Sequence, residues 1–229
     1  SKSKKNTVDP ARIISNFGAD ATRLFILSDS PPEKDVQWSD EGIASAHKFL
    51  QKLWNLNNNI ANEIKKNHEK DSDDELNKFT NKQIKQITNN LTNFSYNKLI
   101  ANMHEIYSFL SKKIINPYTK KTLVENYNKI LTIIIPIVPH FALECLEKNN
   151  LDTNLLWPSY DKSVLIENNI NYVIQINGKK RSLINTKRDI NENNLMKEIE
   201  NIENVKKYFS NKKIKKIIFI KNKLINIIL

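Results

Sequence analysis

The chain has 229 residues and a mass of 26.7 kDa, enough for one large domain or two to three small ones. Charged residues make up 27% of it and apolar residues 39%, which permits a packed core and excludes a wholly disordered chain. The formal net charge is +11, and only 3 residues are glycine. The sequence contains no GxGxxG or GxxxxGK(S/T) motif, which excludes self-contained nucleotide sites of those two types.

Cysteine and histidine usage argues against a metal centre. A single cysteine, Cys145, excludes an intramolecular disulfide and a multi-cysteine zinc site. The four histidines are scattered, with none of the spacings that bind metal ions, so we expect no metal ligands. The most apolar run, residues 130–138, is interrupted by Thr132 and Pro136 and falls short of the ~18 apolar residues of a membrane helix. We therefore expect no membrane partner, a reducing compartment and a cytoplasmic location.

The first helix signals lie close to the N-terminus. Asp9 and Pro10 favour the cap and first position of a short helix, and Gly18 favours its end. Asp20 is expected to cap a second helix. Because Asp20 and Arg23 are three residues apart, they would share a helix face and could pair.

A series of longer helices follows. Apolar residues spaced by three and four predict a long helix from Ser39 to about Ile64, with Gly42 in its first turn, where no sequence signal explains it. Ser72 and Glu75 form a capping box that starts a helix to about residue 91. Further helices are predicted over residues 95–114, over residues 118–135 and after Pro139. Residues 39–148 are thus expected to form an antiparallel bundle of four to five helices.

After residue 158 the apolar spacing becomes strand-like. Asn177-Gly178 is the strongest short hairpin-turn signal, and simple alternation beyond it places Lys179 and Arg181 on one face and Lys180 on the other. The predicted elements are strands at 172–176 and 179–186, helical segments at 192–202 and 205–209, and strands at 214–220 and 224–229. The predicted fold class is mainly α, with a small α+β C-terminal domain that contains a β-hairpin.

Positive charge is concentrated in the last third of the chain. Residues 161–229 contain 15 basic and 7 acidic groups. Such clustering is typical of nucleic-acid binding, although a lysine-rich surface produced by codon bias is an alternative. The basic residues expected to contact nucleic acid are Lys179, Lys180, Arg181, Lys187, Arg188, Lys212, Lys213, Lys215 and Lys216.

The beginning of the chain resembles a known signature. Residues 1–10, SKSKKNTVDP, are similar to the end of the KMSKS motif of class I aminoacyl-tRNA synthetases, which continues as KMSKSKGNxVDP. GAD at 18–20 and RLF at 23–25 resemble the GADxxRLF segment that follows in that family. Lys5 departs from the pattern, because it stands where the family has glycine.

Later segments resemble the leucyl-tRNA synthetases in particular, and those of bacterial type. They are PPEKD at 31–35, WSD at 38–40, HKFL at 47–50, PH at 139–140, WPSYD at 157–161, QINGKKR at 175–181 and LINII at 224–228. Asn222 stands where a turn glycine is usual in that family, a mild change because asparagine tolerates the left-handed region. The resemblance identifies the chain as a C-terminal portion of this family that starts inside the KMSKS motif.

The resemblance implies three domains. These are a KMSKS loop and stem-contact segment at 1–38, a helical bundle of the anticodon-binding type at 39–161 and a C-terminal α+β tRNA-binding domain at 168–229. The catalytic and editing regions would lie upstream, in the same chain or in a separate subunit. The implied activity is ATP-dependent charging of tRNA(Leu) with leucine through leucyl-adenylate, and the fragment alone is expected to be inactive.

The resemblance also implies site residues. Lys2 matches the second lysine of the motif and is expected to neutralise the ATP phosphates, with Ser1 and Ser3 contacting those phosphates or holding the loop. Mg²⁺ is implied by the reaction. The C-terminal domain is expected to grip the outer corner of the tRNA through phosphate contacts and shape. The alternative left open is a stand-alone or subunit tRNA- or RNA-binding protein without catalysis of its own.

Overall fold

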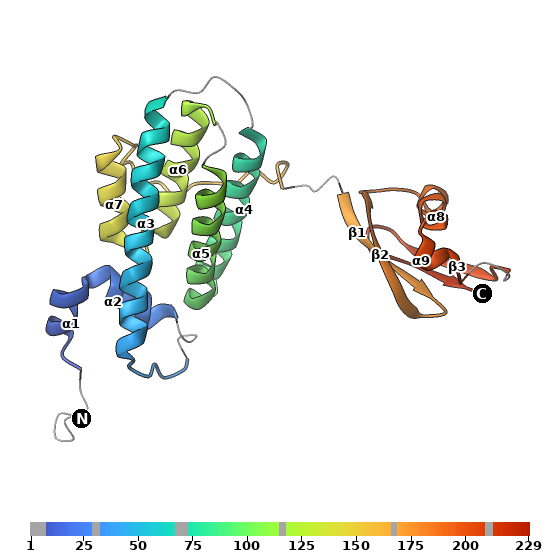
Figure 1. Cartoon of the computed structure of the whole chain (residues 1–229), viewed down its shortest axis with the longest axis horizontal. Coiled ribbons are helices and arrows are strands. Elements are labelled where there is room, and N and C mark those ends of the chain that lie inside the picture. Colours follow the sequence, from blue (N-terminus) through green and yellow to red (C-terminus); the bar gives the residue numbers. More distant parts are fainter. Residues whose placement is uncertain (1–7, 29–32, 67–72, 115–117, 166–168, 209–212) are drawn as a thin grey trace. The chain divides into compact units, whose positions relative to one another are not determined.

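The computed structural model describes residues 8–28, 33–66, 73–114, 118–165, 169–208 and 213–229. The chain divides into two units, Ser1–Leu165 and Ile166–Leu229. The first unit consists of helices, and the second is a four-stranded sheet with two helices (Figure 1). The predicted fold class is therefore confirmed. The predicted cap Ser72 lies outside the described residues.

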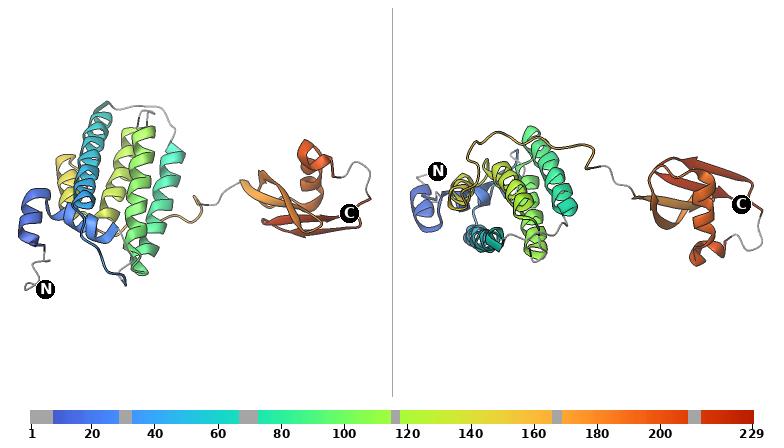
Figure 2. Two further views of the ribbon diagram at one scale, coloured as in Figure 1. Left: turned by 60° about the horizontal axis from the view of Figure 1, so that its bottom comes forward. Right: turned by 90° about the horizontal axis from the view of Figure 1, so that it is seen from above.

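Seven helices form the described part of the first unit. They are α1 (Pro10–Phe17), α2 (Ala19–Ser28), α3 (Asp40–Lys66), α4 (Asp73–Thr92), α5 (Tyr96–Lys113), α6 (Lys120–Ile134) and α7 (Pro139–Lys148). Helices α3 to α6 stand side by side as a bundle (Figures 1 and 2). Their apolar stripes meet in one core, where Ile43, Ile60 and Leu99 are fully buried. Leu24 of α2 joins the same core, and the predicted domain boundary at residue 38 stays a prediction.

Local capping signals explain where several helices begin and end. The Asp9 carboxylate accepts a hydrogen bond from the Ala11 amide at 3.1 Å, and Gly18 ends α1 with a φ of +87°. The hydroxyl of Ser39 accepts from the Gly42 amide at 3.1 Å at the start of α3. These three predictions are confirmed.

Gly42 has a packing role that the sequence did not reveal. A Cβ atom at this position would lie 2.5 Å from Cε2 of Phe25, closer than atoms of neighbouring side chains can approach. Phe25 is buried and packs edge-on against Trp38, with ring centroids 5.2 Å apart. Glycine at position 42 therefore lets α2 place an aromatic ring directly against α3.

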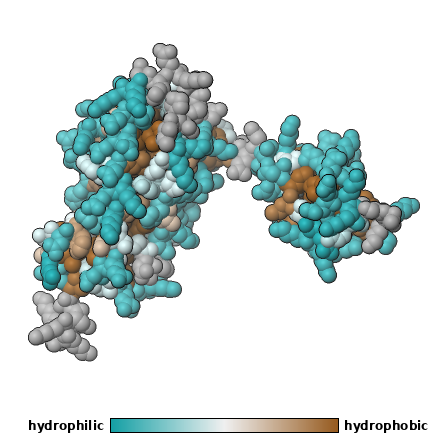
Figure 3. All heavy atoms as spheres, viewed as in Figure 1, coloured by the Kyte–Doolittle hydropathy of each residue, from teal (hydrophilic) through white to brown (hydrophobic). Residues whose placement is uncertain are grey.

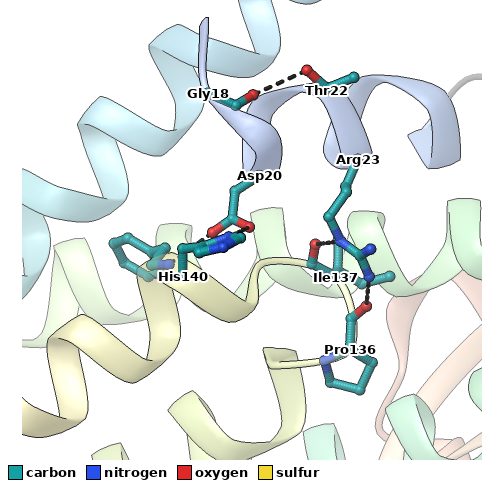
Figure 4. Close-up of polar contacts among 8 residues, drawn as sticks. Gly18, Asp20, Thr22, Arg23, Pro136, Ile137 and His140 are labelled. Carbon is teal, nitrogen blue, oxygen red and sulfur yellow. Dashed lines mark hydrogen bonds and ion pairs between the residues drawn. The ribbon is translucent and has the colours of Figure 1, made fainter. Parts of the chain in front are cut away.

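Helix α2 is fastened to the connection between α6 and α7, an arrangement that we call the α2 clasp (Figure 4). Asp20 lies one residue inside α2, so its predicted capping role there is wrong. Its carboxylate accepts from the Phe141 amide at 2.7 Å and from Nδ1 of His140 at 2.9 Å. Asp20 thus serves the start of α7, where backbone N–H groups have no helical partner and the helix dipole favours negative charge.

Arg23 supplies the second half of the α2 clasp. Its Nε donates to the Ile137 carbonyl at 3.0 Å and its Nη2 to the Pro136 carbonyl at 2.6 Å. The predicted pairing of Asp20 with Arg23 is therefore wrong. The physical reason is that the end of α6 leaves carbonyl groups without helical partners, and these attract the guanidinium more strongly than a neighbour on its own helix face.

The second unit is a mixed sheet in the order β2-β1-β4-β3. Its elements are β1 (Asn169–Ile176), β2 (Lys179–Lys187), α8 (Glu192–Glu200), α9 (Glu203–Lys206), β3 (Lys216–Ile220) and β4 (Leu224–Ile228). β1 and β4 are parallel, whereas the other two pairs are antiparallel. The hairpin turn is confirmed, because Asn177 and Gly178 both have positive φ, 49° and 76°.

Both helices of the second unit lie on one face of the sheet (Figure 2). Tyr172, Ile174 and Ile225 are fully buried there, together with Leu195 and Ile199 of α8. Alternation along the strands directs every second side chain to this face. The other face of the sheet carries no helix among the described residues.

The role of Gly42 is testable by substitution. We expect Gly42→Ala to destabilise the chain by about 1–2 kcal/mol, because overpacking against Phe25 outweighs the better helix propensity of alanine. Ser45→Ala, an exposed position one turn further along α3, should be neutral or slightly stabilising. Urea unfolding followed by circular dichroism measures both, and an unchanged or higher midpoint for Gly42→Ala would contradict the packing argument.

The α2 clasp makes a second prediction. Asp20→Ala should lower the unfolding free energy by about 1.5–3 kcal/mol, because it leaves the Phe141 amide without its charged acceptor. His140→Ala should cost much less, because its side chain is 75% exposed against 7% for Asp20. Chemical denaturation of the two variants provides the comparison. Equal losses would mean that the contact with the Phe141 amide is not the important one.

Candidate nucleic-acid interface

The predicted site residues fall into two groups. Ser1, Lys2 and Ser3, which the sequence analysis assigned to ATP, lie outside the described residues, as does Lys212. Their roles stay predictions. The other eight basic residues belong to the second unit, where all of them are exposed, namely Lys179, Lys180, Arg181, Lys187, Arg188, Lys213, Lys215 and Lys216.

The helix-free side of the sheet carries an apolar row. Strand pairing aligns Leu183, Val173, Leu224 and Ile220 from β2 to β3, one residue from each strand. Leu183 is 51% exposed and Ile220 is 45% exposed. Directly paired residues share a face, and this face is opposite to the one that packs against α8 and α9. We call this helix-free side the open face.

Polar and basic residues flank the apolar row on the open face. The neighbouring row consists of Lys180, Gln175, Asn226 and Ile218. Alternation places Lys187 and Lys216 on the same face, near the ends of β2 and β3. The open face therefore combines apolar area, amide groups that can donate and accept hydrogen bonds, and three ammonium groups.

Arg181 departs from the alternation that the sequence predicts. Ile174 pairs with Ser182 and Gln175 with Lys180, so the pairing skips Arg181. Its guanidinium carbon lies 4.7 Å from the ring centroid of Tyr208, which packs against the apolar cluster beneath the helices. Nζ of Lys207 lies 5.6 Å from the same ring. The irregularity thus joins Arg181 to a cation–π group that the sequence analysis did not foresee.

The turn that contains Arg188 is fastened to the turn between β3 and β4. The Asn222 side chain accepts from the Asp189 amide at 2.8 Å and donates to the Asp189 carboxylate at 3.0 Å. These contacts, together with Lys221 at 3.0 Å and the charge of Arg188, hold the pKa of Asp189 below its usual range. Arg188 therefore lies beside a carboxylate that remains ionised, which weakens its attraction for a phosphate relative to the lysines of the open face.

Asn222 adopts a φ of 60°, the conformation for which the family pattern has glycine. Its own amide donates to the Tyr172 hydroxyl at 2.7 Å. The asparagine therefore preserves the turn and adds contacts that a glycine does not make.

Metal and membrane features are absent from the described residues. In that part of the chain no three His, Cys, Asp or Glu side chains are grouped closely enough to hold a metal ion. These residues do not fit a Mg²⁺ site, and no step through Mg²⁺ is derived from them. None of the described helices has the length and apolar character needed to cross a membrane.

Comparison with known families gives two matches. Residues 73–199 match the family described as the anticodon-binding domain of tRNA ligase. Residues 1–39 match the class I tRNA synthetases for isoleucine, leucine, methionine and valine.

Individual relatives agree with these families. The chain is 38% identical to a leucine–tRNA ligase of Orientia tsutsugamushi and 36% identical to one of Prochlorococcus marinus. Each alignment covers 100% of this chain and 27% of the relative, so the chain spans about a quarter of the length of these proteins.

The fold also matches a solved structure, the ternary complex of Agrobacterium radiobacter K84 agnB2 LeuRS with tRNA and LeuAMS. The TM-score is 0.83 at 21% identity, over 100% of this chain and 30% of that one. The chain therefore belongs to the tRNA ligases that carry this anticodon-binding domain and, among them, to the leucine–tRNA ligases, of which it is a C-terminal portion.

Proposed function

We propose that this chain is the tRNA-docking part of an enzyme that joins leucine to tRNA(Leu) with ATP, through leucyl-adenylate. The observation that supports the proposal is similarity along the whole chain to leucine–tRNA ligases. Because the chain spans 27% of their length, the proposal assigns the catalytic and editing regions to the remainder, in one chain or in a separate subunit. The chain alone should bind tRNA without charging it.

The open face is the proposed docking surface for the tRNA. Affinity for RNA comes largely from ammonium groups that replace counterions at phosphates, and Lys180, Lys187 and Lys216 provide such groups. The apolar row gains free energy when a flat surface removes it from water. Leucine tRNAs differ in their anticodons, so a docking surface for the outer corner of the tRNA serves all of them, whereas one that reads the anticodon does not.

The ATP chemistry is proposed for the segment that precedes α1. Adenylate formation is an in-line attack on the α-phosphate, and negative charge develops on the departing pyrophosphate. The ammonium of Lys2 is proposed to neutralise that charge, with Ser1 and Ser3 donating hydrogen bonds to the phosphates. The α2 clasp supports this assignment, because it fixes the helices that follow the segment and so limits where Val8 enters the fold.

The docking proposal predicts a change in the salt dependence of binding. Lys187→Ala combined with Lys216→Ala should weaken binding to tRNA(Leu) and lower the slope of log K against log salt by about 2, one unit for each lost phosphate contact. Fluorescence titrations of the 229-residue chain at several salt concentrations measure both effects. Lys197→Ala is the control, because this exposed lysine lies on α8, on the other side of the sheet. An equal effect of the control, or no binding to tRNA(Leu) at low salt, would refute the docking surface.

The catalytic proposal predicts the effect of removing the Lys2 ammonium. In the complete enzyme, Lys2→Ala should lower leucine-dependent exchange between ATP and pyrophosphate on the order of 10²–10³-fold. Lys4→Ala removes the same charge two residues away and should have a much smaller effect. Unaltered exchange in Lys2→Ala would remove this residue from the mechanism.

A further inference from the structure

An open cavity of about 650 Å³ lies at one end of the helical unit. It is bounded by α2, by the residues that lead into α3, by the first turns of α3 and by α5. Its aromatic lining consists of Phe25, Trp38, Phe49 and His104, and the exposed side chain of Ser45 belongs to its wall. We call it the α2–α3–α5 cavity.

The walls of this cavity are held by packing. Phe25 contacts Trp38 edge-on, and the indole Nε1 of Trp38 donates to the Asp40 carboxylate at 2.8 Å. The His104 ring stacks on Phe49 with centroids 3.8 Å apart. Partial burial and the charge of Lys52 lower the pKa of His104, so its ring is neutral at pH 7 and acts as an aromatic surface.

Exposed apolar side chains continue from the same elements. Ile26, on α2 beside Phe25, is 45% exposed, and Val36, which directly precedes the cavity residue Gln37, is 38% exposed. Figure 3 shows apolar side chains reaching the surface around the α1–α2 end of the unit. Apolar surface beside an aromatic cavity is typical of a site that another part of a protein covers.

Two observations identify what covers it. The match to the class I tRNA synthetase family ends at residue 39, within the wall that contains Gln37, Trp38 and Ser39. In addition, this chain accounts for only 27% of the length of its relatives. The cavity therefore lies where the synthetase part of the family meets the anticodon-binding part, and ligand and docking cavities form preferentially at such domain junctions.

We infer that the α2–α3–α5 cavity receives an aromatic or branched aliphatic side chain from the catalytic region that the relatives carry beyond the length matched here. The inference rests on the proposed function, because it needs a catalytic region to be present. The uncharged aromatic walls favour such a side chain, since burying a charged group there would require a partner that the cavity wall does not offer. The contact would couple the tRNA-docking part to the catalytic region.

A cysteine reporter tests the inference directly. The one native cysteine, Cys145, is fully buried, and burial raises the pKa of its thiol to about 12, so it does not react with thiol reagents. Ser45→Cys places a reactive thiol at the cavity, and Glu125→Cys places one on the exposed side of α6 as the matched control. Maleimide labelling at each position is followed by peptide mass spectrometry.

The labelling is compared between the chain alone and a chimera in which this chain replaces the matching part of the Orientia tsutsugamushi ligase. We expect labelling at position 45 to slow about tenfold or more in the chimera, with the rate at position 125 unchanged. Equal rates at position 45 would overturn the inference. Leucine charging by the chimera is measured separately. Protection without charging leaves the docking site intact and counts against the proposed function, whereas charging without protection counts against the docking site.

A filling variant provides a second measurement. Ser45→Trp should leave tRNA binding by the chain alone within about twofold of the unsubstituted chain, because the cavity is distant in sequence and unit from the open face. In the chimera it should lower charging by about tenfold or more, because the indole occupies the space of the docking side chain. Undiminished charging would overturn the inference even if the labelling experiment were ambiguous.

Discussion

The α2 clasp is the contact on which the arrangement of the helical unit depends. Asp20 completes the start of α7 and Arg23 completes the end of α6, across 121 and 114 residues of sequence. Helix ends leave backbone groups without partners, and burying such groups unpaired is costly. Two side chains from one turn of α2 satisfy both ends at once, which fixes the position and rotation of α2 on the bundle. Helix α1, joined to α2 through Gly18, is positioned with it.

The same placement of α2 determines the α2–α3–α5 cavity. Once the clasp sets the rotation of α2, Phe25 must lie against the first turn of α3, and only glycine at position 42 leaves room for the ring. Phe25 then supports Trp38, which forms the wall on the side of the residues preceding α3. A polar contact at one side of α2 and a missing side chain on α3 thus together shape an aromatic surface that neither residue would indicate alone.

The features that sequence analysis predicted correctly are those that depend on near neighbours. The caps at Asp9 and Ser39 and the turn at Asn177-Gly178 each involve atoms within four residues, so local rules suffice. Asp20 also looked like a local cap, but its acceptor atoms are used by a helix far along the chain. The skipped pairing at Arg181 is a property of two strands together, and the periodicity of one strand cannot reveal it.

The open face raises the same difficulty for function. Composition left two explanations for the lysines of the last third, RNA binding and codon bias, and charge alone did not separate them. Bias acts on composition, whereas binding requires position. The order β2-β1-β4-β3 places β4 between β1 and β3, and only this order aligns Leu183 with Ile220 across the sheet. The order was not readable from the sequence, because strands that are distant along the chain become neighbours. Lys180, Lys187 and Lys216 then share the one face that no described helix covers with an apolar row, and this combination favours an RNA surface over a lysine excess without function.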